Sequence, residues 1–387
     1  MSEKMADKGT GHIAVIGTGI AGMASAIGLA NAGWQVTIFG PHSSPLQGGL
    51  QLAPNGLQAL SDLQLLDACR PSLTPLDAIE IRSVRLQKIL ASIDHRTPAK
   101  RDYGSFHRGT LLDILTTRAA QMPLIHHDTR MVTACEEAED ALTLICEDAT
   151  TSRFDLVIGA DGKDGLCRSL IAGEEPARPS SYIAMRAQVP ATALPPLFTV
   201  PRTQLWLGDG YHLVHYPLQQ GTLVNLVLCM ARPRQEADTA HFQQLDGHPY
   251  QSALTSPDIR WVETPLPMAE TLPVWRKGRL ALLGDAAHFM PPHLAQGAGQ
   301  TLEDAASLSK AMAQVTAREN DAVTALSEWA IQRARMVAPI VKRAEQTGKI
   351  MRLSGPLARL RNMAIDIGGQ SFIETWLQQV WQPELDK

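Results

Sequence analysis

The first forty residues of the chain contain two apolar runs separated by a glycine-rich turn and a helix-forming stretch. Residues 12–16 and 34–39 are short apolar runs rich in β-branched residues, which is typical of buried strands. Between them, residues 23–32 are good helix formers, and Gly33 stands where a helix commonly ends in a left-handed residue. The pattern predicts a strand, a turn, a helix and a second strand, which together form a βαβ unit.

Further along the chain the hydrophobic period changes twice. Residues 130–158 alternate between apolar and polar positions, which predicts an antiparallel hairpin that ends in a buried strand. Short strand-like runs separated by proline-rich turns follow and predict an antiparallel sheet in a second lobe: 182–189, 203–207, 211–216 and 223–230. The last part predicts a buried strand, a helix and one long amphipathic helix: 279–283, 301–315 and 321–350. We expect Trp376, Leu377, Val380 and Trp381 to cap the core.

Composition excludes several classes of protein. Of 387 residues, 44% are hydrophobic and 19% are charged, so the chain can bury a large core and is not disordered. Lys and Arg number 35 against 39 Asp and Glu, a net charge of −4. Without a basic excess we expect no nucleic-acid partner. No apolar run is long enough for a membrane span.

The five cysteines show no pattern that indicates pairing. They are Cys69, Cys135, Cys146, Cys167 and Cys229. An odd number without a C-x-x-C spacing argues against a disulfide framework and against a thiolate metal site. We therefore expect small core residues, no bound metal, and a cytoplasmic protein.

Three glycines occupy the turn of the βαβ unit. Gly17, Gly19 and Gly22 have the spacing G-x-G-x-x-G between a predicted strand and a predicted helix. Unpaired N–H groups at a helix N-terminus bind phosphate, and glycine lets a pyrophosphate approach them closely. The turn therefore predicts a dinucleotide site, the alternative being a tight turn that binds nothing.

One part of this fingerprint is missing. A carboxylate usually ends the second strand and binds the ribose hydroxyls, but here the position is Gly40, followed by Pro41. The nearest polar groups that could replace it are His42, Ser43 and Ser44. The sequence therefore predicts weaker cofactor binding, and a glutamate at Gly40 is expected to strengthen it.

Two further motifs follow predicted strands, and with the glycines they resemble a known family. They are Asp161-Gly162 and Gly284-Asp285, the latter followed by a Pro- and Gly-rich loop over 291–299. Together the three motifs resemble the single-component FAD-dependent aromatic hydroxylases typified by 4-hydroxybenzoate hydroxylase. The resemblance extends to about residue 381.

Finer motifs point to one branch of this family. Residues 184–187, 206–208, 212–217, 223–225 and 292–298 are similar to salicylate hydroxylase, 3-hydroxybenzoate 6-hydroxylase and 6-hydroxynicotinate 3-monooxygenase. Ubiquinone-biosynthesis hydroxylases, the alternative among enzymes, usually carry a different flavin loop, from which this chain departs at Ala295 and Gly299. A flavin-binding protein without monooxygenase activity is the alternative from another class, because of the missing ribose carboxylate.

The resemblance implies an α/β fold with a Rossmann-like FAD-binding domain, an antiparallel β-sheet substrate domain and C-terminal helices. The FAD-binding domain would comprise 1–76, 98–178 and 268–350, the substrate-binding domain 77–97 and 179–267, and the C-terminal helical segment 351–387. Non-covalent FAD would be bound by Gly17, Gly19, Gly22, Arg108, Asp161, Asp285, Pro291, Gly297 and Ala298.

The resemblance also implies the reaction. NADH or NADPH would dock transiently, because the family has no second nucleotide-binding domain. A small aromatic or heteroaromatic substrate, in particular a phenolic acid, would be hydroxylated with O2 through a hydroperoxide formed on the flavin. The protein would be a monomer or a homodimer.

Phenol hydroxylation is faster on the phenolate, so a base near the ring is expected. The resemblance marks His212, Tyr216 and His293 as the active-site positions. Strand alternation places His212 and Tyr216 on one face and His215 on the other. With ordinary pKa values near 6.5 both active-site histidines suit a base, and we favour His212 because a strand is more rigid than a loop. Arg186 would bind a substrate carboxylate or form a structural ion pair.

Overall fold

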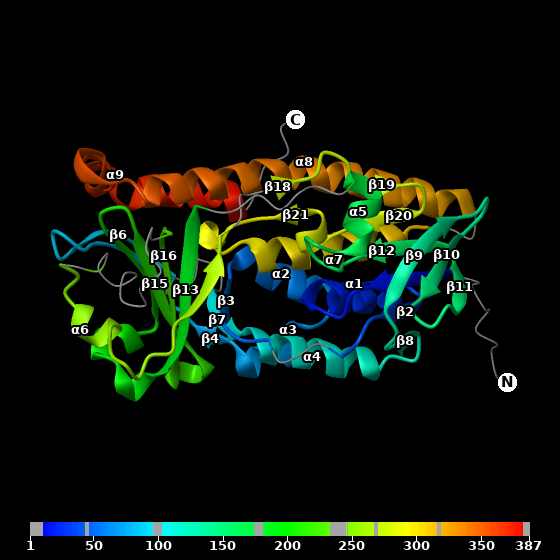
Figure 1. Ribbon diagram of the computed structural model, residues 1–387, viewed down its shortest axis with the longest axis horizontal. Helices are drawn as coiled ribbons and strands as arrows, with labels where there is room; N and C mark the ends of the chain where they lie inside the picture. The colour runs from blue at the N-terminus through cyan, green and yellow to red at the C-terminus, as the bar shows by residue number, and fades with distance from the viewer. Residues whose placement is uncertain are drawn as a thin grey trace.

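The computed structural model describes residues 11–42, 46–95, 103–173, 181–232, 245, 247–266, 270–315 and 319–381. Two large sheets lie at opposite ends of an elongated molecule (Figure 1). The two longest helices, α8 (Glu319–Met351) and α9 (Gly355–Trp381), run along one edge from the first sheet to the second. None of the described helices is long and apolar enough to cross a membrane.

The first sheet contains the predicted βαβ unit. Its order is β19-β20-β12-β1-β2-β8, and all neighbours are parallel except β19 and β20. The strands are β1 (His12–Ile16), β2 (Gln35–Phe39), β8 (Ile125–Asp128), β12 (Leu156–Gly159), β19 (Arg276–Lys277) and β20 (Leu280–Leu282). Helix α1 (Ile20–Asn31) connects β1 to β2 and packs against α4 (Arg108–Ala120) and α7 (Gly297–Ala313). The prediction for the first forty residues is confirmed.

The second sheet contains the strand runs predicted for the second lobe. Its order is β17-β13-β16-β15-β14-β5-β6. The strands are β5 (Ala78–Ser83), β6 (Lys88–Asp94), β13 (Tyr182–Pro190), β14 (Arg202–Leu207), β15 (His212–Leu218), β16 (Leu223–Ala231) and β17 (Val262–Pro265). All pairs are antiparallel except β14 with β5. Helix α9 packs against the edge strand β6, at the end of the molecule far from β1.

Smaller elements complete the fold. The predicted hairpin is a three-stranded antiparallel sheet of β9 (Val132–Glu137), β10 (Leu142–Cys146) and β11 (Thr151–Phe154). Two further small sheets pair β3 (Gly49–Leu52) and β4 (Thr74–Pro75) with β7 (Gly104–His107), and β18 (Glu270–Thr271) with β21 (His288–Phe289). The remaining α-helices are α2 (Pro54–Asp62), α3 (Leu66–Cys69), α5 (Leu166–Ala172) and α6 (Gln251–Leu254).

Helix α7 begins at Gly297, four residues before the predicted start at residue 301. Glycine has a low helix propensity, so residue types alone do not favour a helix that extends through Gly297 and Gly299. Tertiary contacts support this first turn instead. The Gln296 side chain accepts hydrogen bonds from Asn55 at 2.8 Å and from Gln300 at 3.1 Å.

The C-terminal prediction is confirmed. Val380 is fully buried in the main hydrophobic core, and the side chains of Trp376, Leu377 and Trp381 pack against that core. The five cysteines are unpaired, and four of them are buried.

A buried ion pair holds the Gly284–Ala286 turn beneath α7. Asp304 of α7 accepts hydrogen bonds from the backbone N–H of Gly284 at 3.0 Å and from His288 Nε2 at 2.6 Å. Its other oxygen accepts from Arg333 Nε of α8 at 2.8 Å. All three side chains are buried, and His288 stacks on Trp275 at 5.0 Å. This network fixes the turn that carries Asp285.

Candidate active site

A cavity of about 840 Å³ lies between the two large sheets and is lined from both. The structure brings most of the predicted site residues together on its wall: Gly17, Gly19, Arg108, Asp161, His212, Tyr216, Asp285, His293, Gly297 and Ala298. Gly22 and Pro291 are not on the wall. Gly22 lies behind it in α1, and Pro291 precedes the short helix η7 (Pro292–Leu294) that carries His293.

The three glycines of the first turn meet different surroundings. Gly17 has φ +118°, and a Cβ there would lie 2.4 Å from the carbonyl oxygen of Ala160. A Cβ at Gly22 would lie 1.8 Å from the oxygen of Gly17. A Cβ at Gly19 would meet nothing within 4 Å. Gly17 and Gly22 therefore serve the packing of the turn, whereas Gly19 faces open cavity at the N-terminus of α1.

The two acidic turns also face the cavity. Asp161 accepts a hydrogen bond from the backbone N–H of Cys167 at 2.9 Å and so caps α5, while its other oxygen is buried and has no hydrogen-bond partner among the described residues. Arg168 of α5 donates to the carbonyl of Ala286 at 2.7 Å, which ties the two turns together. Loss of hydration raises the pKa of both Asp161 and Asp285.

Gly40 is required by the backbone at the end of β2. Its φ is +132°, and its N–H donates to the carbonyl of Asp128 at 3.0 Å. A Cβ would lie 3.4 Å from Thr18 Cγ2, so a glutamate is strained here and the expected gain in binding from it is not supported. Of the predicted substitutes for the ribose carboxylate, His42 is exposed, and Ser43 and Ser44 lie outside the described residues.

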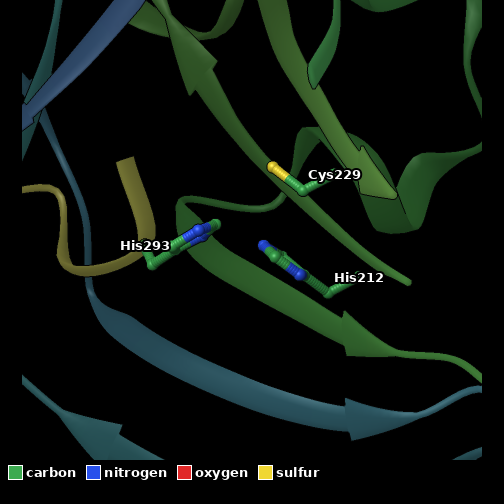
Figure 2. Close-up of side chains that lie close together, drawn as sticks. All are labelled: His212, Cys229 and His293. Atoms are coloured by element: carbon green, nitrogen blue, oxygen red, sulfur yellow. The ribbon is translucent and has the colours of Figure 1, made fainter. Parts of the chain in front are cut away.

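Three side chains from different elements converge on the second-lobe side of the cavity (Figure 2). His212 on β15 and Cys229 on β16 are directly paired across the two strands. His293 reaches them from η7, and its ring centroid lies 5.2 Å from that of His212. One donor atom from each of the three lies within 4.8 Å of the others. The interpretation of Cys229 as a plain core residue is therefore incomplete, because its thiol lies on the cavity wall.

Burial changes the acid–base properties of both histidines. It lowers the pKa of His212 well below 6.5, and the positive charges of Arg352 and Arg361 add to the effect. Burial, Arg352 and Arg186 lower the pKa of His293 to about 3. The expectation of ordinary pKa values near 6.5 is therefore wrong. Both rings are neutral at neutral pH, and Nδ1 of each has no hydrogen-bond partner in the described part of the chain.

Strand alternation on β15 follows the prediction. Tyr216 shares the cavity face with His212, and burial raises its pKa to about 12 despite a side-chain hydrogen bond with Gln51. His215 points to the opposite face, where it accepts a hydrogen bond from Trp206 Nε1 at 3.2 Å and packs on Phe198. Tyr216 is thus a neutral hydrogen-bonding group of the cavity, and His215 belongs to the core.

Two arginines supply positive charge near the histidines. Arg186 on β13 lines the cavity, and its Nε donates to Thr264 at 3.2 Å. It makes no ion pair with any carboxylate of the described chain, which removes the structural ion-pair alternative for those residues. Arg352, just after α8, lies 2.8 Å from His293. Sequence reasoning missed it, since a basic residue at the end of a long amphipathic helix carries no signal of a site.

Comparison with known proteins identifies the family. The model of the FAD-binding-domain family matches residues 11–344 of the chain. The chain belongs to this family. Among its relatives, the 3-amino-4-hydroxybenzoate 2-monooxygenase PtmB3 of Streptomyces platensis is 31% identical and covers 92% of each chain. The 3-hydroxybenzoate 6-hydroxylase 1 of Aquipseudomonas alcaligenes is 28% identical and covers 82% of this chain and 84% of its own.

A solved structure shows the same overall fold. A salicylate hydroxylase in complex with substrate superimposes with a TM-score of 0.82 at 22% identity, covering 98% of this chain and 97% of that one. The resemblance stated from the sequence motifs is therefore confirmed, and the protein is an FAD-dependent aromatic monooxygenase.

The residues of the first-sheet side fit FAD. Helix α1 starts at the cavity without an acidic residue in its first turn, and the open space over Gly19 accommodates a pyrophosphate. The Asp161 oxygen that lacks a partner in the described part of the chain and the Asp285 carboxylate are acceptors suited to hydroxyl groups. On the same wall, the first N–H groups of α7, at Gly297 and Ala298, suit a negatively charged part of the flavin.

Two glycine variants of this FAD-binding protein separate binding from folding. Gly19→Ala is expected to weaken FAD binding about 10- to 100-fold, because the new methyl group enters the space over the helix N-terminus. It should change the stability of the apoprotein by about 1 kcal/mol or less. Gly22→Ala should instead destabilise the apoprotein, since its methyl group meets the Gly17 carbonyl. FAD titration and urea unfolding of both variants check this, and unchanged FAD affinity in Gly19→Ala would contradict it.

Proposed function

We propose that this monooxygenase acts on a small aromatic or heteroaromatic ring that carries both a hydroxyl group and a carboxylate, with NADH or NADPH as the electron donor. The observation that carries this proposal is the Arg186 guanidinium, which lines the cavity and forms no ion pair with a described carboxylate. A half-buried cation of this kind favours an anionic ligand. The relatives named for hydroxybenzoates are consistent with such a substrate.

The substrate ring would lie between the flavin end of the cavity and the His212–His293 side. FAD supplies the oxygen-transfer chemistry when bound. The protein groups would orient the ring and control the proton of its hydroxyl group. His212 is neutral because burial holds its pKa low, so it has a lone pair to accept that proton. Tyr216 would add a neutral hydrogen bond on the same face.

Burial of the wall also excludes water from the reaction. Leu266, Val227 and Cys229 are buried residues of the cavity wall on the second-lobe side. An apolar wall leaves few water molecules near the reacting ring, and it strengthens each hydrogen bond to the substrate.

The proposal is tested by a substrate screen with the FAD-loaded enzyme. Hydroxybenzoates, aminohydroxybenzoates and hydroxynicotinates, each beside the matching compound without its carboxylate, are assayed for stimulated NADH and NADPH oxidation and for product mass. The expected result is stimulation by a carboxylated member and a product that has gained one oxygen atom. Preference for phenols without a carboxylate would indicate a quinone-type hydroxylase, and no stimulation at all would indicate a flavin-binding protein without this activity.

Arg186→Met tests the anchor directly. With the best substrate, KM is expected to rise about 10- to 100-fold, because a charge-assisted hydrogen bond is lost. The matching compound without the carboxylate should show an unchanged KM. Arg232→Met, which removes an exposed guanidinium of the same lobe paired with Glu263, is the control and should behave as wild type. An equal loss for both compounds would contradict the assignment.

A further inference from the structure

The ring of His293 is held from behind by the end of α8. A Cβ at Gly348 would lie 2.2 Å from His293 Cδ2 and 2.4 Å from Nε2, so the ring packs directly on the helix backbone at this glycine. Arg352 follows one helical turn later, and its backbone N–H donates to the carbonyl of Gly348 at 3.2 Å. Its Nη1 lies 2.8 Å from His293 Nε2. The Nε2 edge of the ring therefore faces α8 and Arg352.

This contact decides where the ring carries its hydrogen. A guanidinium can only donate hydrogen bonds, so Nε2 of His293 must be the acceptor. A neutral histidine has one N–H group, and that group is consequently at Nδ1. Burial and the neighbouring arginines hold the pKa of His293 at about 3, which keeps the ring neutral. Nδ1 is buried and has no partner within the described residues.

The Arg352 side chain is itself held in place. Its guanidinium carbon lies 4.2 Å from the centre of the Tyr182 ring, a cation–π arrangement that fixes the plane of the donor group. Arg352 reaches no carboxylate in the described part of the molecule. The Arg352 guanidinium therefore contacts His293 and not a carboxylate of the described chain.

We propose that Arg352 is a positioning residue that holds His293 as the Nδ1–H tautomer, so that His293 donates a hydrogen bond to the hydroxyl oxygen of the substrate. This inference rests on the proposed function for the identity of the acceptor. His212, whose ring centroid lies 5.2 Å away, is then the ring that accepts the proton. The two histidines divide donor and acceptor roles that the sequence could not distinguish.

The same three side chains have the residue types of a soft-metal site, and the charges around them argue against a cation. Nε2 of His293 is already occupied by a guanidinium, and Arg186 and Arg352 both face the cluster. Burial raises the pKa of Cys229 to about 11, so its thiol is protonated, whereas metals bind the thiolate. These contacts favour the hydrogen-bonding role.

The tautomer is measured by ¹⁵N NMR of histidine-labelled protein, with the His293 signals assigned from their absence in His293→Gln. Wild type is expected to show a protonated Nδ1 and an unprotonated Nε2 from pH 6 to 8. Arg352→Met should shift the population towards Nε2–H, and Arg352→Lys, which can also only donate, should restore the wild-type pattern. Arg335→Met, which removes an exposed guanidinium from the same helix, is the matched control.

A wild-type spectrum with Nε2–H, or an unchanged His293 tautomer in Arg352→Met, would overturn the inference. The wild-type measurement needs no substrate, and it uses only the His293→Gln variant, for the assignment. With a substrate in hand, Arg352→Met should lower the product formed per NAD(P)H by about 2- to 10-fold, the effect of one neutral hydrogen bond. Failure to find any substrate would count against the proposed function and leave the tautomer measurement intact.

Discussion

His212→Gln is expected to slow hydroxylation by about 10²- to 10⁴-fold, the usual contribution of a general base, while FAD content stays at the wild-type level. Glutamine keeps a hydrogen-bonding side chain on β15 but cannot take up a proton. The substrate would then remain a neutral phenol, whose ring is a poor nucleophile. NAD(P)H should still be consumed, with hydrogen peroxide released in place of product. Product formed per NAD(P)H and hydrogen peroxide yield measure this.

His215→Gln is the matched control for this experiment. It removes an equally buried imidazole from the same strand, but from the face that packs on Phe198 and away from the cavity. Glutamine can still accept the hydrogen bond from Trp206. We expect wild-type coupling in the control. Equal losses in the two variants would show that any disturbance of β15 uncouples the enzyme, and wild-type coupling in His212→Gln would remove His212 as the base.

Asp304→Asn is expected to destabilise the protein by about 3–5 kcal/mol, because the variant leaves buried Arg333 and His288 without their carboxylate. Hydrogen bonds from Arg333 to Gln300 and its ion pair with Glu303 remain, which favours the lower end of that range. Urea unfolding of the apoprotein at pH 7 measures the change. Asp366→Asn, which breaks the exposed pair with Lys88, should cost about 1 kcal/mol or less.

The effect of Asp304 also has a defined pH dependence. Burial alone would raise the pKa of this carboxyl, but the charges of His288 and Arg333 outweigh burial and hold the pKa below its usual value. A depressed folded-state pKa stabilises the protein at neutral pH, and that stability is lost as pH falls through the folded-state pKa. The difference between wild type and Asp304→Asn should therefore narrow below about pH 4. A constant difference down to pH 3 would contradict the assigned charge.

The sequence predicted those parts of the site that local patterns determine. Glycine spacing located the turn at Gly17, and period-two alternation placed His212 and Tyr216 on one face of β15. Both follow from chain geometry over a few residues, which a sequence displays directly. The start of α7 at Gly297 was missed because a hydrogen bond to the preceding Gln296 from Asn55, which is distant in sequence, outweighs the low helix propensity of glycine.

What the sequence could not show depends on burial and on long-range contacts. Pattern reasoning assigned His212 and His293 ordinary pKa values, because desolvation is a property of the folded cavity. Arg352 lies 59 positions after His293, and nothing local marks it as a partner. Gly40 shows the same limit. The residue type alone showed that the ribose carboxylate is missing. The positive φ of Gly40, which makes glutamate unsuitable there, could not be seen from the sequence.

Gly348 places a constraint on engineering this enzyme for heat resistance. A glycine inside a helix is a common target for replacement by alanine, which adds about 1 kcal/mol of helix propensity. In α8 the added methyl group would occupy the position of the His293 ring, at 2.2 Å from Cδ2. Any gain in thermal tolerance at this position would thus be opposed by displacement of an active-site histidine. A methyl group at Gly348 and the His293 ring cannot occupy the same space. Stabilising substitutions should therefore be sought elsewhere in α8.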